Sequence, residues 1–390
     1  MKQKNMFVYF AVFITVLTQA PLLRERLGID TQLLMFPFWG IAAASTICSN
    51  KRLSVTLTKY YYVLFFSILF GCILLSSTTG DNYFFAFTIT IGMALFIFFI
   101  GNQNGELLYD DWLFSKMCNV YCIASLILAI DIYIEYLAGY SLQTIDYVYR
   151  SKNSAGQILL SAGVFMGYLL KNKKWKFLKL AVMGFFLIEI VLLRSRATIL
   201  SVLLIPVILL LSSNVNKKYK YTTVGILTIV IIFFSLNENA FDLIVNNVLF
   251  NSTSSVDFSS LNLDKVTSNR YSLLRSFPKQ LSGREFTGLG SSFYVDNLFV
   301  NAIGNYGVFF GLLVAILSLL PVLDSCCSKF KNRDLTNGKK IVLRIIFCTY
   351  TFNGLFEAWA PLGPGGKCFI FWLLLGMLYS GYRRKVVKNA

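Results

Sequence analysis

The segment from Phe84 to Gly101 reads FFAFTITIGMALFIFFIG and contains no charged side chain over eighteen residues. As an α-helix it would be about 27 Å long, close to the roughly 30 Å hydrocarbon core of a bilayer. Similar stretches recur along the 390-residue chain, of which 56% is hydrophobic and only 14% charged. A water-soluble surface needs more polar coverage than that. We therefore predict an all-α, polytopic membrane protein in which residues 1–390 form a single transmembrane domain.

Apolar stretches of roughly 15 to 25 residues predict about twelve transmembrane helices. The predicted spans are Met6 to Leu23, Leu33 to Cys48, Tyr60 to Ser77, Phe84 to Gly101, Met117 to Ala138, Gly156 to Leu170, Leu180 to Leu193, Ile199 to Ser213, Tyr221 to Leu236, Asn297 to Leu323, Ile341 to Glu357 and Cys368 to Gly381. The long connection between spans nine and ten, residues 237–296, has apolar residues at helical spacing. We expect a large, partly helical outer loop there.

The basic residues set the predicted orientation, because cytoplasmic loops of membrane proteins are enriched in Lys and Arg. With the N-terminus inside, 24 of the 36 basic residues fall in inner segments and 12 in outer ones. Both chain ends are therefore predicted to be cytoplasmic.

Several classes of site and partner are excluded by composition. Histidine is absent, so no Ser-His-Asp triad can form. The eight cysteines include no CxxC pair, and the chain has no phosphate-binding Walker loop. The net charge of +17 comes from short basic runs between apolar segments, which argues against a nucleic-acid partner. Any chemistry must use carboxylates, arginines and positioning, and we expect neither a cofactor nor a metal.

Arginines gather on the predicted outer face. Arg194 and Arg196 lie in an outer turn of five residues, while Arg270, Arg275 and Arg284 lie in the long outer loop. A guanidinium forms bidentate hydrogen bonds with phosphate oxygens, so these residues favour a diphosphate-linked lipid as ligand. The alternative is attachment to lipid headgroups, or internal salt bridges, without catalysis.

Four local patterns occur in a recognisable order. The first is Tyr149-Arg150-Ser151-Lys152-Asn153-Ser154-Ala155-Gly156, which enters a span, and the second is Arg194-Ser195-Arg196-Ala197, where a span ends. In the third, Arg270 of the long loop precedes Gly288-Leu289-Gly290, and the loop closes with Asp296-Asn297-Leu298-Phe299 before the next span. The fourth is Leu355-Phe356-Glu357, which ends a span. Their order and sidedness resemble the O-antigen polymerase and O-antigen ligase superfamily of polytopic glycosyltransferases. The likeness covers roughly Gly139 to Gly381.

This resemblance implies an activity and a location. The chain would polymerise undecaprenyl-diphosphate-linked oligosaccharide repeat units into the O-antigen of lipopolysaccharide or into capsule, on the outer face of a bacterial plasma membrane. It would be a metal-independent glycosyltransferase with the lipid diphosphate as leaving group. Its partners would be the lipid-linked oligosaccharide and the bilayer, with a chain-length regulator protein as a further candidate.

The resemblance also implies roles for individual residues. Arg196 and Arg270 would bind the lipid diphosphate, and Asp296 and Glu357 are the candidate catalytic bases. The remaining substrate-binding candidates are Arg194, Arg275, Arg284 and Asn153.

Three alternatives stay open. Asp296 stands where the ligases carry a histidine before asparagine, so a chain without histidine favours a polymerase over a ligase. A transporter or polysaccharide flippase has the same layout, but such proteins usually show repeated halves and polar sites near mid-membrane, and we find no internal repeat. A purely structural membrane partner is the third alternative.

The predicted orientation can be tested with single-site labels. Because Lys174 and Lys331 lie in basic inner runs, labels there should react only from the cytoplasmic side, and a label at Asn262 only from outside. Reaction of Asn262 from the cytoplasm would contradict an outer site.

Overall fold

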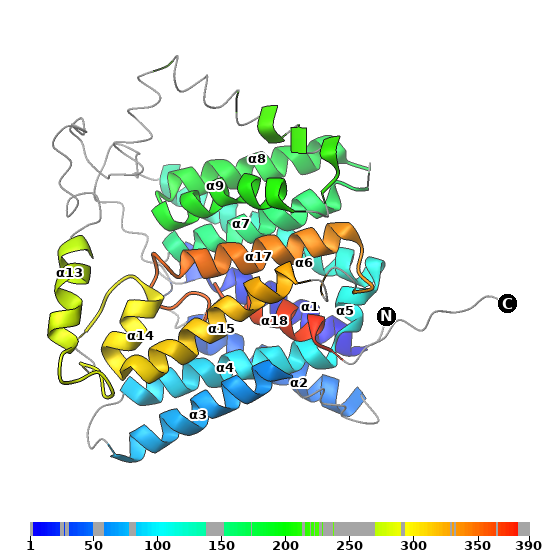
Figure 1. The fold of residues 1–390 in the computed structure, drawn as a ribbon. Coiled ribbons are helices and arrows are strands. Elements are labelled where there is room, and N and C mark those ends of the chain that lie inside the picture. Colours follow the sequence, from blue (N-terminus) through cyan, green and yellow to red (C-terminus); the bar gives the residue numbers. More distant parts are fainter. Residues whose placement is uncertain are drawn as a thin grey trace.

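The computed structural model describes residues 3–23, 27, 31–49, 58–77, 83–137, 152–172, 174–212, 215–218, 220–221, 223–225, 228, 237, 270–289, 293–327, 330, 333–363 and 366–380. All regular structure in these residues is helical, which confirms the predicted all-α class (Figure 1). The helices are α1 (Gln3–Leu17), α2 (Thr31–Ser49), α3 (Lys59–Ser77), α4 (Tyr83–Gln103), α5 (Glu106–Tyr109), α6 (Asp111–Leu137), α7 (Lys152–Leu169), α8 (Lys176–Leu192), α9 (Arg196–Leu211), α13 (Arg270–Leu281), α14 (Leu298–Tyr306), α15 (Val308–Cys326), α17 (Asn337–Asn353) and α18 (Phe369–Leu378).

Two of the described helices, α6 and α15, are long and apolar enough to cross a membrane. They agree with a membrane protein, whereas the count of about twelve spans stays a prediction. The predicted ninth span falls largely outside the described residues, and residues 238–269 of the long outer loop fall outside them entirely. The helix that we predict over 241–249 in that loop therefore also lies outside them.

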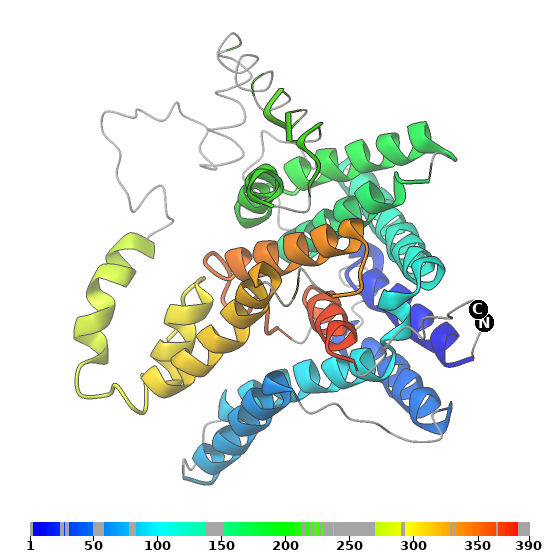
Figure 2. The ribbon, with the colours of Figure 1, turned by 45° about the vertical axis from the view of Figure 1, so that its right-hand side comes forward.

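Helix α18 lies in the middle of the molecule (Figure 2). All ten of its residues are buried, as expected for a helix that is apolar on every side. Its aromatic residues contact three neighbouring helices. Phe369 packs on Trp39 of α2 and Tyr121 of α6, and Phe371 packs on Phe347 of α17, with ring centroids 5.3 to 6.0 Å apart.

Glycines let α18 approach α4 at the level of the backbone. A Cβ atom built on Gly101 would lie 2.3 Å from the Leu373 carbonyl oxygen, and one on Gly376 would lie 2.1 Å from the Phe98 carbonyl oxygen. Both contacts are too short for any side chain. This part of the core therefore depends on two glycines, one on each helix.

The predicted span from Asn297 to Leu323 is not one helix. It is divided into α14 and α15 at Gly307, whose φ of 86° belongs to the left-handed region. A Cβ atom on Gly307 would lie 2.2 Å from the Phe286 carbonyl oxygen. Gly288, also at positive φ, packs against the Asn305 backbone in the same way. Gly288, the first glycine of the Gly288-Leu289-Gly290 pattern, thus allows the end of the long loop to pack on this corner.

Ion pairs join distant helices at the predicted inner end of the bundle. Asp324 of α15 accepts hydrogen bonds from Lys59 at 2.5 Å, from Tyr60 at 2.6 Å and from Tyr379. The buried ammonium group of Lys339 lies 2.5 Å from an Asp111 carboxylate oxygen. Each cluster contains only residues that the sequence places on the same side of the membrane.

The contact between α4 and α18 can be tested with a matched pair of glycine substitutions on α4. Gly101→Ala should lower the free energy of unfolding by about 1–3 kcal/mol, because backbone atoms cannot rotate away from the added methyl group. Gly92→Ala is the control, since its Cβ would meet no atom within 4 Å. Unfolding midpoints of the two variants, measured on purified protein in detergent, should therefore differ. Equal midpoints would contradict the close approach.

Candidate functional site

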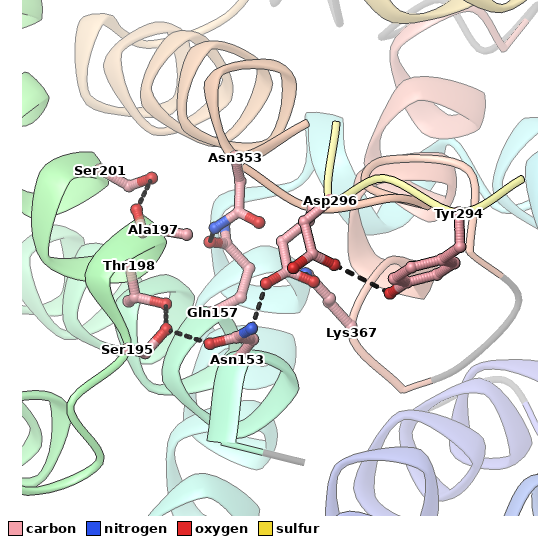
Figure 3. Close-up of polar contacts among 11 residues, drawn as sticks. Asn153, Gln157, Ser195, Ala197, Thr198, Ser201, Tyr294, Asp296, Asn353 and Lys367 are labelled. Carbon is pink, nitrogen blue, oxygen red and sulfur yellow. Dashed lines mark hydrogen bonds and ion pairs between the residues drawn. The ribbon is translucent and has the colours of Figure 1, made fainter. Parts of the chain in front are cut away.

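Three of the four sequence patterns meet at the side chain of Asn153. Because α7 begins at Lys152, Asn153 lies in its first turn and points towards the segment that follows α17. Its amide nitrogen donates to Glu357 Oε1, and its amide oxygen accepts from Ser195 Oγ at 2.9 Å (Figure 3). Ser195 also bonds Thr198, with the hydroxyl oxygens 2.8 Å apart. A chain of hydrogen bonds thus links residues about two hundred positions apart in the sequence.

Lys367 completes the surroundings of Glu357. Its ammonium nitrogen lies 3.4 Å from Glu357 Oε2, and the two side chains are only 11% and 17% exposed. Charges so far from water need a partner, and each of these two side chains provides one for the other. Lys367 is one of the 12 basic residues of the predicted outer segments, and it was not predicted as a site residue. Its place ten residues after Glu357, at the end of the short outer segment that follows the Glu357 span, was the available signal.

A polar stripe continues from Asn153 along α7. Gln157 and Ser161 follow at intervals of four residues, so all three side chains lie on one face of the helix. Gln157 accepts a hydrogen bond of 3.0 Å from Asn353, and Ser161 lies 3.1 Å from the Tyr350 hydroxyl. These contacts join α7 to α17 below the Asn153–Glu357 contact. Sequence reasoning missed Gln157 and Asn353, although polar residues spaced by four in an apolar helix could have indicated them.

The remaining pattern, which closes the long loop, packs against the segment that carries Glu357. Asn297 caps α14 by accepting hydrogen bonds from the Phe299 and Val300 amides, and its own amide group donates to the Leu355 carbonyl oxygen at 3.1 Å. Asp296 is half-buried beside this junction and accepts a hydrogen bond of 2.9 Å from the Tyr294 hydroxyl. The two candidate bases are thus carried by segments that contact each other.

The turn with Arg194 and Arg196 packs closely against the first turns of α7. A Cβ atom on Gly156 would lie 2.7 Å from the Thr198 hydroxyl oxygen, which shows how closely α7 approaches the start of α9. Arg194 is buried and has a left-handed backbone with φ of 50°, a conformation that costs energy for a residue other than glycine. Such strain is retained where the surrounding structure requires it.

Positive charge accumulates around this turn. Lys152 precedes the predicted span that starts at Gly156. Burial lowers the pKa of Lys152, and the positive charges of Arg196 and Arg194 lower it further, while the negative charge of Glu357 raises it. Burial also lowers the pKa of Arg194. Three cations from two segments therefore share one region beside Glu357. Such a region favours an anionic ligand.

The three loop arginines are on or just beyond α13. This helix packs on the segment before α14, with the Phe277 and Phe293 ring centroids 5.2 Å apart. Arg275 and Arg284 are exposed, whereas the structure describes the backbone of Arg270 but not its side chain. The expected meeting of Arg270 with Arg196 therefore stays a prediction.

No protein-family model matches the chain, and no curated protein matches it. Among the described residues, no group of three His, Cys, Asp or Glu side chains could hold a metal ion. Within this part of the chain, the chemistry available at the site is that of carboxylates, amides, hydroxyls and fixed cations. Such a set can bind and orient an anion, stabilise developing negative charge and accept a proton.

A double-mutant cycle tests the pairing of Glu357 with Lys367. Lys367→Met should be strongly destabilising because it leaves a buried carboxylate without its cation, while the double variant with Glu357→Gln should recover part of the loss. We expect a coupling free energy of about 1–3 kcal/mol from unfolding of the purified protein.

The exposed Lys279 on α13 supplies the matched control. Lys279→Gln combined with Glu357→Gln should be additive. Additivity of the Lys367 and Glu357 substitutions would contradict the ion pair.

Proposed function

We propose that the chain is a glycosyltransferase that polymerises undecaprenyl-diphosphate-linked oligosaccharide repeat units on the outer face of a bacterial plasma membrane. One observation carries the proposal. The sequence patterns that resemble O-antigen polymerases lie far apart in the chain, yet Asn153 contacts Ser195 and Glu357, and Asn297 contacts Leu355. These contacts between the four patterns support a shared site that contains both candidate bases.

The cations beside Glu357 fit the leaving group of the proposed reaction. When a growing glycan is transferred to the hydroxyl of the next repeat unit, the bond to the lipid diphosphate breaks and negative charge develops on its oxygen. Arg194, Arg196 and Lys152 would offset that charge, an effect commonly worth several kcal/mol of barrier. Arg194 is already buried and the other two are half-buried, so part of their desolvation precedes substrate binding.

The two carboxylates are suited to different tasks. Both oxygens of Glu357 have partners, Asn153 on one and Lys367 on the other, so we assign Glu357 to holding the site together. Asp296 is half-buried on a loop that contacts the segment carrying Glu357, and its carboxylate accepts a hydrogen bond from the Tyr294 hydroxyl. We therefore favour Asp296 as the group that accepts the proton of the acceptor hydroxyl.

Location and partners follow from the same proposal. The two helices long enough to cross a membrane support membrane association. The plasma membrane, two cytoplasmic termini and an association with a chain-length regulator protein are further parts of the proposal. In this arrangement the growing polysaccharide leaves on the side of Asn153 and Glu357.

The experiment that tests the function replaces Arg196 and Arg270 separately by Ala. Each change removes a planar partner of the diphosphate, and a loss of about 3 kcal/mol at the transition state slows transfer more than a hundredfold. Arg→Lys should rescue poorly, because a point charge does not reproduce the fork of a guanidinium. The readout is polymer length on a gel, measured together with the amount of protein in the membrane.

Lys279→Ala is the control, since Lys279 shares α13 with Arg270 and is exposed. It should leave the polymer at full length. Normal protein abundance with a single repeat unit per lipid in the arginine variants would support catalysis. Normal abundance with full-length polymer would refute the assignment of these arginines.

A further inference from the structure

A polar pocket lies at the C-terminal end of α7, opposite the end that carries Asn153. It has a volume of about 310 Å³. Its lining includes Ser115 and Asn119 of α6, Lys171, Lys174 and Trp175 of the α7–α8 connection, and Lys179 of α8. None of its lining residues is acidic. Because Asn153 lies in the first turn of the 18-residue helix α7 and the pocket lies at its last turn, about 25 Å of helix separates the two regions. The pocket is thus distinct from the candidate site.

Contacts within the protein hold two of the three lysines in place. Lys179 Nζ donates to the Leu169 and Asn172 carbonyl oxygens, both at 3.0 Å. Lys171 Nζ donates to the Tyr168 hydroxyl at 2.5 Å and lies 4.1 Å from the centre of that ring. These bonds fix the connection that follows α7 and keep two positive charges at the rim of the pocket.

Lys174 adds a third charge that does not support the fold. Its backbone amide donates to the Asn172 side chain at 3.1 Å, and its own side chain is exposed. An ammonium group has three donors and no acceptor, so three such groups around one cavity repel each other unless an anion lies between them. The pocket is therefore suited to an anion with several acceptor oxygens, such as a phosphate.

The surroundings of the pocket indicate where that phosphate comes from. Ser115 and Asn119 lie in the first turns of α6, which is one of the two helices able to cross a membrane. Large aromatic side chains are exposed nearby, with Trp175 at 67%, Trp112 at 61% and Phe177 at 86%. Trp is enriched where a membrane meets water, with its ring at the level of the lipid headgroups.

We propose that this pocket binds the phosphate of an anionic phospholipid, with Lys171, Lys174 and Lys179 around the phosphate and Trp175 beside the lipid. Basic pockets between transmembrane helices bind anionic headgroups in this way. The site is independent of the proposed glycosyltransferase activity. Its role is to hold the α7–α8 connection against the membrane surface.

Native mass spectrometry of the full chain in detergent tests the proposal. The probes are phosphatidylglycerol and phosphatidylcholine with the same acyl chains, which differ in net charge. Wild-type protein should retain phosphatidylglycerol preferentially, and Lys174→Gln should lower that retention about fivefold, the effect expected for one basic residue near anionic lipid. Its unfolding midpoint should stay unchanged because the Lys174 side chain is exposed.

Lys176→Gln is the matched control, since Lys176 is exposed in the same basic run but does not line the pocket. Retention of phosphatidylglycerol by this variant should equal that of the wild type. Equal losses in both variants would mean diffuse surface charge and would overturn the proposal, as would equal retention of the two lipids by the wild type. If inorganic phosphate at millimolar concentration removed the lipid preference, the pocket would be a site for free phosphate and the lipid assignment would be wrong.

Discussion

The backbone contact between α4 and α18 is the constraint on which the remaining packing depends. With glycines at the crossing, α18 can be buried on every side, and its aromatic residues then fix the neighbouring helices. Phe371 packs on α17, and α17 in turn contacts α7 through Asn353 and Tyr350. The first turn of α7 and the segment after α17 carry Asn153 and Glu357. The position of the candidate site is therefore set by an apolar core that contains none of its residues.

The polar stripe on α7 shows how that apolar core is joined to a charged site. Amide and hydroxyl pairs lie between α7 and α17, and only at the end of the stripe do ionised groups occur. Neutral hydrogen bonds cost less to bury than charges do, so this order reduces the energy of placing Glu357 and Lys367 beside a membrane-like interior. It also orients the Asn153 amide, because both of its polar atoms are used.

Composition was sufficient to predict the fold class, because a chain with so few charged residues can bury its backbone polar groups only in helices or closed barrels. The resemblance selected Asn153 and Glu357 as separate site residues and gave Ser195 no role. Their hydrogen bonds to one another were not predicted and are seen only in the structure. Lys367, Gln157 and Asn353 were not predicted as site residues, because each is a single polar residue whose partner is distant in the sequence. The helix break at Gly307 was not predicted for a similar reason. A glycine in an apolar segment does not by itself indicate a break, and here the reason for it is the contact with the Phe286 backbone.

The corner between α14 and α15 has a consequence for how the protein is made. Helix α15 begins at Val308, and its first amide donates to the Glu285 carbonyl oxygen at 2.7 Å, while the Leu289 amide donates to the Gly304 carbonyl oxygen at 2.5 Å. Both partners belong to the end of the long loop. Since buried backbone groups without partners are costly, this corner is complete only when the end of the long loop has packed against α14 and α15. The segment around Glu285 and Leu289 and the α14–α15 corner therefore reach their final structure together, although the chain connects them only through the residues that precede Asn297.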